Sequence, residues 1–163
     1  MLKRVILVPL LLLAATPGFA ADVVRHKIPN STFPISAAVE VPAGKTLVFL
    51  SGAVPPVADT AAAKDSPQAY GDTRTQTVGV LTSIEKQLKS MGLSLGDVVK
   101  MQVFLVGDPA KGGKMDFAGF MAGYTQFFGT PAQPNLPSRS AMQVAGLASP
   151  NFLVEIEVTA VRP

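Results

Sequence analysis

The segment FLVEIEVTAV, residues 152–161, alternates apolar and polar side chains along most of its length. Successive side chains of a β-strand point to opposite faces, so the pattern predicts a strand with one apolar and one more polar face. The first face carries Phe152, Val154, Ile156 and Val158, and the second carries Leu153, Glu155, Glu157 and Thr159. No other segment of the chain predicts a strand as clearly.

Two segments space their apolar residues as an α-helix does. The first is 73–91, with Asp72 as a candidate N-cap and Gly92 as a candidate stop. The second is 115–128, which ends at Gly129. Its large apolar side chains form one broad stripe, which we interpret as a face of the hydrophobic core: Phe117, Phe120, Met121, Tyr124, Phe127 and Phe128.

Further strands are predicted where Val, Ile, Leu, Phe and Thr accumulate, near 35–41, 46–51, 97–106 and 138–145. The resulting order, β-β-β-α-β-α-β-β, predicts an α+β fold, a mixed sheet with two helices on one face. No segment remains to cover the other face of the sheet. The sequence therefore predicts an oligomer that packs sheet against sheet.

The N-terminus predicts export. Lys3 and Arg4 precede the apolar run 5–15, and the small residues Gly18 and Ala20 flank a cleavage position. We expect residues 1–20 to be a secretory signal and 21–163 to form one secreted or periplasmic domain, with no membrane association after cleavage. An uncleaved N-terminal anchor is the alternative, which the helix-breaking Pro17 and Gly18 after the run disfavour.

Composition excludes several kinds of chemistry. The chain has no cysteine and one histidine, His26, which excludes thiol catalysis, cysteine-ligated metals and multi-histidine metal sites. Two of the 14 basic residues and none of the 11 acidic residues lie in 1–20, which leaves 12 basic against 11 acidic in the predicted domain. This near-neutral balance has no basic cluster, so we expect no nucleic-acid partner. We also expect no metal and no cofactor.

Two motifs suggest chemistry that their context does not support. Residues 92–96 match G-x-S-x-G, but they leave a helix and enter a strand, whereas a nucleophile elbow leaves a strand and enters a helix. The glycine-rich stretch 107–114 resembles a phosphate-binding loop, but Gly113 occupies the lysine position of that motif. We interpret both as turns.

The C-terminal third of the chain resembles a known family. The runs PSRSAMQVAGL (137–147) and VEIEVTA (154–160) are similar to the P-x-R-[ST] strand and the closing [VI]-E-I-E strand of the Rid (RidA/YjgF-like) enamine and imine deaminases. Earlier segments agree in order along nearly the whole predicted domain: LSG at 50–52, Gln76 in the first helix, GLSLGDVVK at 92–100 and YTQFF at 124–128.

The resemblance implies a chorismate-mutase-like homotrimer with ligand clefts between subunits. It also implies a cofactor-free reaction in which water converts a 2-imino acid or its enamine into a 2-keto acid and ammonia. Arg139 matches the arginine that binds the substrate carboxylate, a task that suits its planar fork. Glu155 matches the glutamate that positions water. Ser51, Gly52 and the backbone N–H of Ala141 match parts of the cleft wall.

Three positions depart from the family pattern. Ile35 stands where active members often have tyrosine, Ala141 replaces a frequent cysteine, and Met121 replaces a polar asparagine. These departures leave two alternatives open: a non-catalytic module that binds small carboxylates through Arg139, or a holdase-like protein of the same fold. Retention of Glu155 favours the enzyme.

Overall fold

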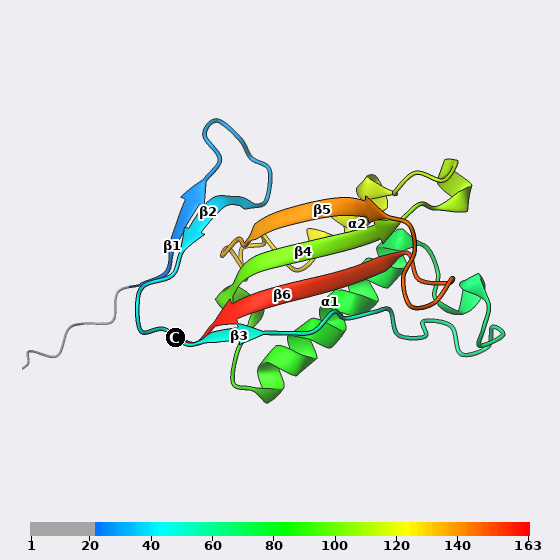
Figure 1. Cartoon of the computed structure of the whole chain (residues 1–163), viewed down its shortest axis with the longest axis horizontal. Helices are drawn as coiled ribbons and strands as arrows, with labels where there is room; N and C mark the ends of the chain where they lie inside the picture. The colour runs from blue at the N-terminus through cyan, green and yellow to red at the C-terminus, as the bar shows by residue number, and fades with distance from the viewer. Residues whose placement is uncertain (1–21) are drawn as a thin grey trace, which may run out of the picture.

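The structure, a computed structural model, describes residues 22–163 and has the predicted order of strands and helices (Figure 1). Short 3-10 turns occur at Pro67–Ala69, Leu95–Asp97 and Pro109–Lys111. The first strand had no predicted range, whereas the other five lie within or close to their predicted segments. The regular elements are β1 (Val24–Lys27), β2 (Ser36–Glu40), β3 (Leu47–Phe49), α1 (Thr73–Ser90), β4 (Val98–Val106), α2 (Phe117–Tyr124), β5 (Ser138–Val144) and β6 (Val154–Val161).

The strands form one six-stranded mixed sheet in the order β1-β2-β5-β4-β6-β3. The β4 strand runs parallel to β5 and antiparallel to β6, and residues Lys100–Val106 pair with Ser138–Val144 without a break. The β1–β2 hairpin joins the sheet through a single residue pair, Ser36 with Ser138. The hairpin lies at one edge of the sheet (Figure 1), where the guanidinium of Arg25 attaches it by donating to the carbonyls of Gly96 and Val98 at 2.9 Å and of Leu136 at 2.7 Å.

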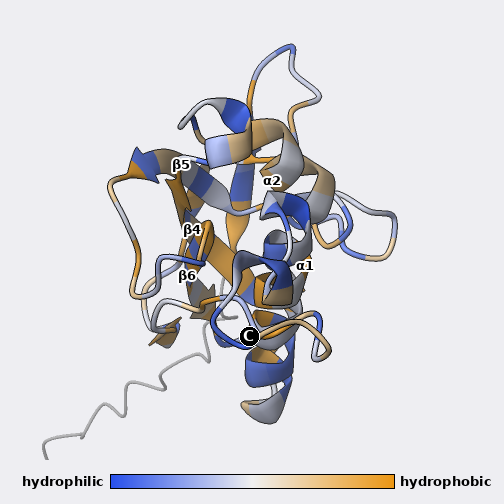
Figure 2. Ribbon diagram, turned by 90° about the vertical axis from the view of Figure 1, so that its right-hand side faces the viewer, coloured by the Kyte–Doolittle hydropathy of each residue, from blue (hydrophilic) through white to orange (hydrophobic). Residues whose placement is uncertain are grey.

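Both helices lie on the same side of the sheet (Figure 2). The core between the helices and the sheet is apolar, and the removal of apolar side chains from water is the main driving force for folding. Its fully buried members include Leu81, Ile84, Leu88, Met101, Val103, Leu105, Phe120, Tyr124, Val154 and Ile156. This arrangement confirms the predicted α+β class and the predicted coverage of one face.

The opposite face of the sheet carries a mixture of apolar and charged side chains. Phe49 is 75% exposed there and Met142 is 38% exposed, and both lie among Phe104, Glu155 and Glu157. No element of residues 22–163 packs over these side chains. An oligomer that covers this face stays a prediction.

Helix α1 begins and ends as the sequence predicts. The carboxylate of Asp72 accepts a hydrogen bond of 2.8 Å from the backbone N–H of Thr75, and Gly92 has a φ of +70°, a conformation that favours glycine. Gln76, buried on the same helix, accepts from the N–H of Leu153 at 2.7 Å and donates to the carbonyl of Asn151 at 3.0 Å. These bonds attach α1 to the start of β6.

Helix α2 is shorter than predicted. It spans Phe117–Tyr124 instead of 115–128, begins at the cap Asp116 and ends in tight turns that lead to Gly129. Gly119 and Gly123 lower its helix propensity, and Gly123 lies so close to the side chain of Thr77 that a Cβ would collide with it. The aromatic stripe continues through the turns after the helix has ended. The apolar spacing therefore overestimated the length of the helix.

The predicted leader, residues 1–20, and its cleavage site lie outside the described residues. Within 22–163, no helix is long and apolar enough to cross a membrane.

Replacement of Asp72 by alanine should lower the free energy of unfolding by about 1 kcal/mol, because the first turn of α1 loses its cap. Asp72→Asn should retain most of this contribution, because an amide oxygen caps nearly as well as a carboxylate. Urea denaturation of the two variants and the wild type measures the difference. Equal stability of the alanine variant and the wild type would show that the cap contributes nothing.

Candidate functional site

Arg139 lies on β5 and points toward the helices. Its Cα partner across the parallel pairing is Met101, which is fully buried against them. Neighbouring residues in a sheet present their side chains to the same face, so the half-buried guanidinium enters the layer between sheet and helices.

Four aromatic rings surround this guanidinium. The Cζ atom of Arg139 lies 4.2 Å from the ring centroid of Tyr124, 4.9 Å from that of Phe120, 5.5 Å from that of Phe33 and 6.0 Å from that of Phe117. A cation over the face of an aromatic ring is attracted by the ring quadrupole. These contacts hold the cation in place but leave its N–H donors in need of acceptors.

The donors of Arg139 are poorly satisfied. Nη2 lies 3.3 Å from the sulfur of Met121, a weak acceptor, and Nη1 is buried without any hydrogen-bond partner among the described residues. No carboxylate in this part of the chain pairs with Arg139. Burial lowers its pKa, yet arginine stays protonated in proteins, so the site is a cation that lacks an anion.

Tyr124 fixes the wall of this site. Its hydroxyl donates a 2.8 Å hydrogen bond to the carbonyl of Pro34, and its ring stacks on Phe128 at 5.0 Å between centroids. Burial raises the pKa of Tyr124 to about 12, although the charge of Arg139 opposes the change. The neutral hydroxyl thus attaches the loop between β1 and β2, including Ile35, to α2 beside Arg139.

Glu155 lies on the opposite face of the sheet. Its neighbours Val154 and Ile156 are both fully buried on the helix side, so the alternation of β6 directs Glu155 away from the helices. Its carboxylate lies against Gly52, where any Cβ would collide with it. Gly52 stands there because Ala53 bonds to Ile156 through both backbone groups, at 2.9 and 3.1 Å.

The predicted site residues therefore form two groups in one chain. Met121, Ile35 and Ala141 accompany Arg139 on the helix side, whereas Glu155, Gly52 and the exposed Ser51 accompany the other face. A single chain does not bring Arg139 and Glu155 together. Arg139 can bind a carboxylate and Glu155 can act as a general base, so each group has one of the two functions that a carboxylate-binding hydrolytic site needs.

The structure also shows where the serine of the G-x-S-x-G match and the single histidine lie. Ser94 caps the turn Leu95–Asp97 and bonds to the carboxylate of Asp97 at 2.9 Å, which confirms that the G-x-S-x-G match is a helix-to-strand turn. His26 is exposed on β1 and pairs with Glu40 at 2.6 Å. No three His, Asp or Glu side chains within 22–163 cluster as metal ligands do.

Comparison with known proteins identifies the family. The family model described as endoribonuclease L-PSP matches residues 25–162, nearly the whole described chain. The chain belongs to this family, which includes the YjgF and Rid proteins. The resemblance found in the sequence is thereby confirmed.

Members with related sequences carry different names. The chain is 32% identical over 117 residues to a 2-iminobutanoate/2-iminopropanoate deaminase of Salmonella typhimurium, which covers 72% of this chain and 80% of the relative. It is 30% identical over 135 residues to a RutC family protein of Pyrococcus abyssi, which covers 83% and 91%.

Solved structures of the family share the fold. The crystal structure of Escherichia coli TdcF with bound serine is similar with a TM-score of 0.55 and 33% identity, and the match covers 76% of this chain and 85% of that one. YyfB of Yersinia pestis, from the Rid family, gives a TM-score of 0.65 at 23% identity, with 87% and 100% coverage, and supports the fold alone.

Sequence reasoning did not find the aromatic surroundings of Arg139. It assigned Phe120, Tyr124 and Phe128 to the core, and their full burial confirms this. Their second role depends on the side of the sheet that Arg139 faces. The alternation of the segment 138–144 in this family member could have indicated that side, but no signal in the sequence places Phe33.

Tyr124→Phe should lower the free energy of unfolding by about 1 kcal/mol at neutral pH, because the carbonyl of Pro34 loses its donor. The phenol of an unfolded chain ionises near pH ~10, whereas the buried Tyr124 stays protonated up to about 12. Tyr124 therefore stabilises the folded state fully below pH ~10, and this contribution is lost as the pH rises toward ~12.

Urea denaturation of both proteins over this alkaline range measures the difference. We expect the advantage of the wild type to shrink as the pH rises. Groups that titrate in both proteins cancel in the comparison. An advantage that stays constant across the range would contradict the assignment of a protonated Tyr124.

Proposed function

We propose that this protein is a hydrolytic deaminase that converts 2-imino acids and their enamine tautomers into 2-keto acids and ammonia. The observation that carries the proposal is the half-buried guanidinium of Arg139, whose buried Nη1 has no hydrogen-bond partner and which has no acidic neighbour among the described residues. Such a group is costly to bury unless an anion binds to it. A substrate carboxylate is an anion of the right shape, because it accepts two parallel hydrogen bonds from the guanidinium fork.

The relatives support the choice of reaction. A deaminase of 2-iminobutanoate and 2-iminopropanoate from Salmonella typhimurium is 32% identical to this chain over most of its length. TdcF of Escherichia coli has been crystallised with serine, a small carboxylate. Both agree with a ligand that presents a carboxylate to Arg139.

In the proposed reaction, Glu155 takes a proton from water as the oxygen attacks the carbon of the protonated imine, C=NH2+. The product of this step is a neutral tetrahedral amino alcohol with a new C–O bond. Glu155 then returns that proton to the nitrogen, and the C–N bond breaks as ammonia leaves. The C=O bond of the 2-keto acid forms as the hydroxyl proton passes to Glu155 and on to solvent. A carboxylate within reach of the reacting atoms serves both steps as general base and general acid. The backbone N–H of Ala141 is proposed as a further donor to the substrate carboxylate.

We propose that the complete site forms between neighbouring chains of a homotrimer. Arg139 and Glu155 point to opposite faces of one sheet, so one chain cannot use both on the same substrate. The uncovered sheet face, with Phe49 75% exposed, supports association. In such an assembly, Arg139 of one chain would meet Glu155, Ser51 and Gly52 of its neighbour.

Arg139→Ala and Glu155→Gln should each lower kcat/KM by roughly 100-fold or more, because one removes the anion site and the other the general base. An amino-acid oxidase supplies the imino acid, and semicarbazide traps what remains, so faster loss of imine reports activity. Arg139→Lys should recover only part of the activity, since lysine lacks the planar fork. Arg74→Ala, which removes an exposed charge from α1, and Glu157→Gln, on the same strand face, serve as controls.

A mixture of the Arg139→Ala and Glu155→Gln chains tests the shared site. Co-refolded at equal amounts, about a quarter of the sites in a closed ring should pair an intact Arg139 with an intact Glu155 of the next chain. Activity near that fraction of wild type is expected, although each variant alone is nearly inactive. No recovery in verified mixed oligomers would place both residues of a site in one chain.

The non-catalytic binding module is favoured by one observation, the thioether of Met121 against Arg139, at a position where some family members have a polar asparagine. Binding of 2-keto acids that depends on Arg139, without any acceleration of imine loss, would establish this second function. Inactivity without carboxylate binding would overturn both proposals.

Gly52→Ala should lower kcat/KM by roughly 100-fold, because the new methyl group displaces the carboxylate of Glu155 from its position. The fold should persist, since the φ of Gly52 lies outside the left-handed region. Gly146→Ala is the matched control, because a Cβ there meets no atom within 4 Å. Equal activity of the two variants would show that the placement of Glu155 does not matter.

A further inference from the structure

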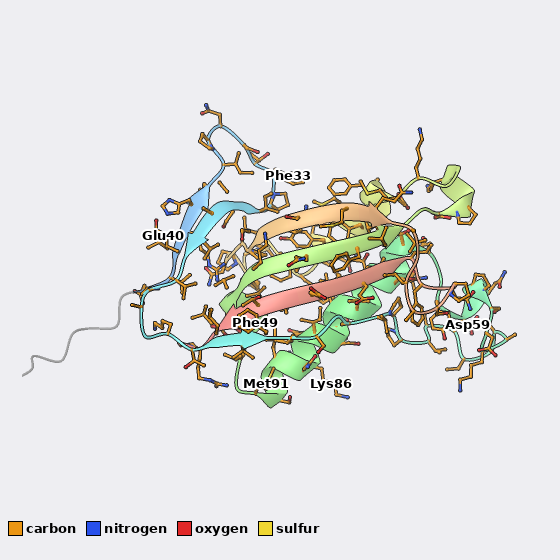
Figure 3. The ribbon with its side chains drawn as sticks, viewed as in Figure 1. Phe33, Glu40, Phe49, Asp59, Lys86 and Met91 are labelled. Atoms are coloured by element: carbon orange, nitrogen blue, oxygen red, sulfur yellow. The ribbon has the colours of Figure 1, made fainter. Side chains whose placement is uncertain are left out.

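Phe33 is the one ring around Arg139 that does not belong to α2. It lies on the loop that joins β1 to β2, beside β5, and it is 40% exposed (Figure 3). Its ring stacks on Phe117 with 6.5 Å between centroids and 21° between planes, and it lies 5.5 Å from Cζ of Arg139. Of the four rings around the guanidinium, only that of Phe33 is exposed.

The backbone on either side of Phe33 differs in how firmly it is held. Pro34 accepts from the hydroxyl of Tyr124 at 2.8 Å, and the hydroxyl of Ser36 donates to the carbonyl of Leu136 at 2.7 Å. On the other side, residues 28–33 form hydrogen bonds only within their own loop among the described residues, as in the 3.1 Å bond from the N–H of Phe33 to the hydroxyl of Ser31. Phe33 therefore stands at the end of a loose segment next to a fixed one.

The other side chains that contact the guanidinium are mostly apolar. Phe117 and Phe120 are hydrocarbon, Met121 presents a thioether, and the hydroxyl of Tyr124 uses its proton on the carbonyl of Pro34, which leaves its oxygen as the one polar acceptor. On the side of this chain, a ligand whose carboxylate binds Arg139 thus meets a largely apolar wall, and the polar residues of the proposed neighbouring chain approach only its C=N end. A polar side chain would lose its hydration there and gain few hydrogen bonds in return.

We infer that Phe33 is a specificity-determining residue, and that it makes the Arg139 site select 2-imino and 2-keto acids with an aromatic or large apolar side chain. Because Nη1 is buried, the ligand carboxylate reaches the N–H that has no partner by displacing the exposed ring of Phe33, and the ligand side chain then stacks against that ring. A small ligand disturbs the contact between Phe33 and Arg139 and forms no ring contact in its place. An aromatic ligand replaces it with a new ring contact. The inference rests on the proposed carboxylate site.

Calorimetric titration with 2-keto acids tests the inference without requiring turnover. The probes are pyruvate, phenylpyruvate and 2-ketoglutarate, which present the same carboxylate with a small, an aromatic and a charged side chain. Wild type should prefer phenylpyruvate to both others. Phe33→Ala should reduce the preference over pyruvate by about twofold to tenfold, the range expected for one aromatic pair.

Two further variants separate ring stacking from simple burial and from general damage. Phe33→Leu keeps an apolar side chain but no ring, so its preference should fall between those of the wild type and Phe33→Ala. Phe152→Ala removes a ring that packs on Tyr70, outside the Arg139 site, and should leave the preference unchanged. Circular dichroism checks that each variant is folded.

The outcomes distinguish this inference from the proposed deaminase activity. A preference that is lost in Phe33→Ala supports the inference even if no imine is hydrolysed. An unchanged preference in Phe33→Ala, or no preference in the wild type, overturns the inference even if Arg139-dependent deamination is observed. Equal weakening of all three ligands in Phe33→Ala also overturns it, because Phe33 would then support the site without selecting among ligands.

Discussion

The register of β4 with its two neighbours is the constraint on which the site depends. Residues Lys100–Val106 pair in unbroken order with Ser138–Val144, and the same strand pairs antiparallel with β6. Side chains alternate between the faces of a sheet, so a slip of one residue in either pairing would send Arg139 or Glu155 to the other side. The buried face of β4, with Met101, Val103 and Leu105, prevents such slips because they would expose the core.

This register gives the protein a cation in an unusual environment. Arg139 enters the layer that helices and sheet bury, and aromatic rings contact it in place of a carboxylate. Cation–π contacts supply part of what the guanidinium loses with its water, but they satisfy none of its donors. The proposed function supplies the missing acceptor as the carboxylate of a bound ligand. The same rings that hold Arg139 would then contact the rest of that ligand.

Membership in the endoribonuclease L-PSP family is compatible with several activities, because a fold does not by itself specify a function. The site argues for small carboxylates. The single histidine of the chain, His26, pairs with Glu40 on the exposed hairpin, outside the group of side chains around Arg139. The thioether of Met121 lies against the guanidinium of Arg139, at a position where some family members have asparagine. The chemistry proposed for Glu155 then requires a second chain, since the two halves of the site face away from each other.

Short-range patterns were sufficient for much of this protein. The caps of α1, the alternation of β6, the order of the elements and the resemblance at 137–147 all follow from neighbouring residues, because a cap, a turn or a strand face depends on residues a few positions apart. The extent of α2 did not follow, since its apolar stripe continues into turns where the helix has ended. Nor did the separation of Arg139 from Glu155, or the contact of Phe33 with Arg139 across more than 100 positions of chain. These depend on which strands pair, in which register, and on where a loop comes to rest against a helix, and only the tertiary structure decides them.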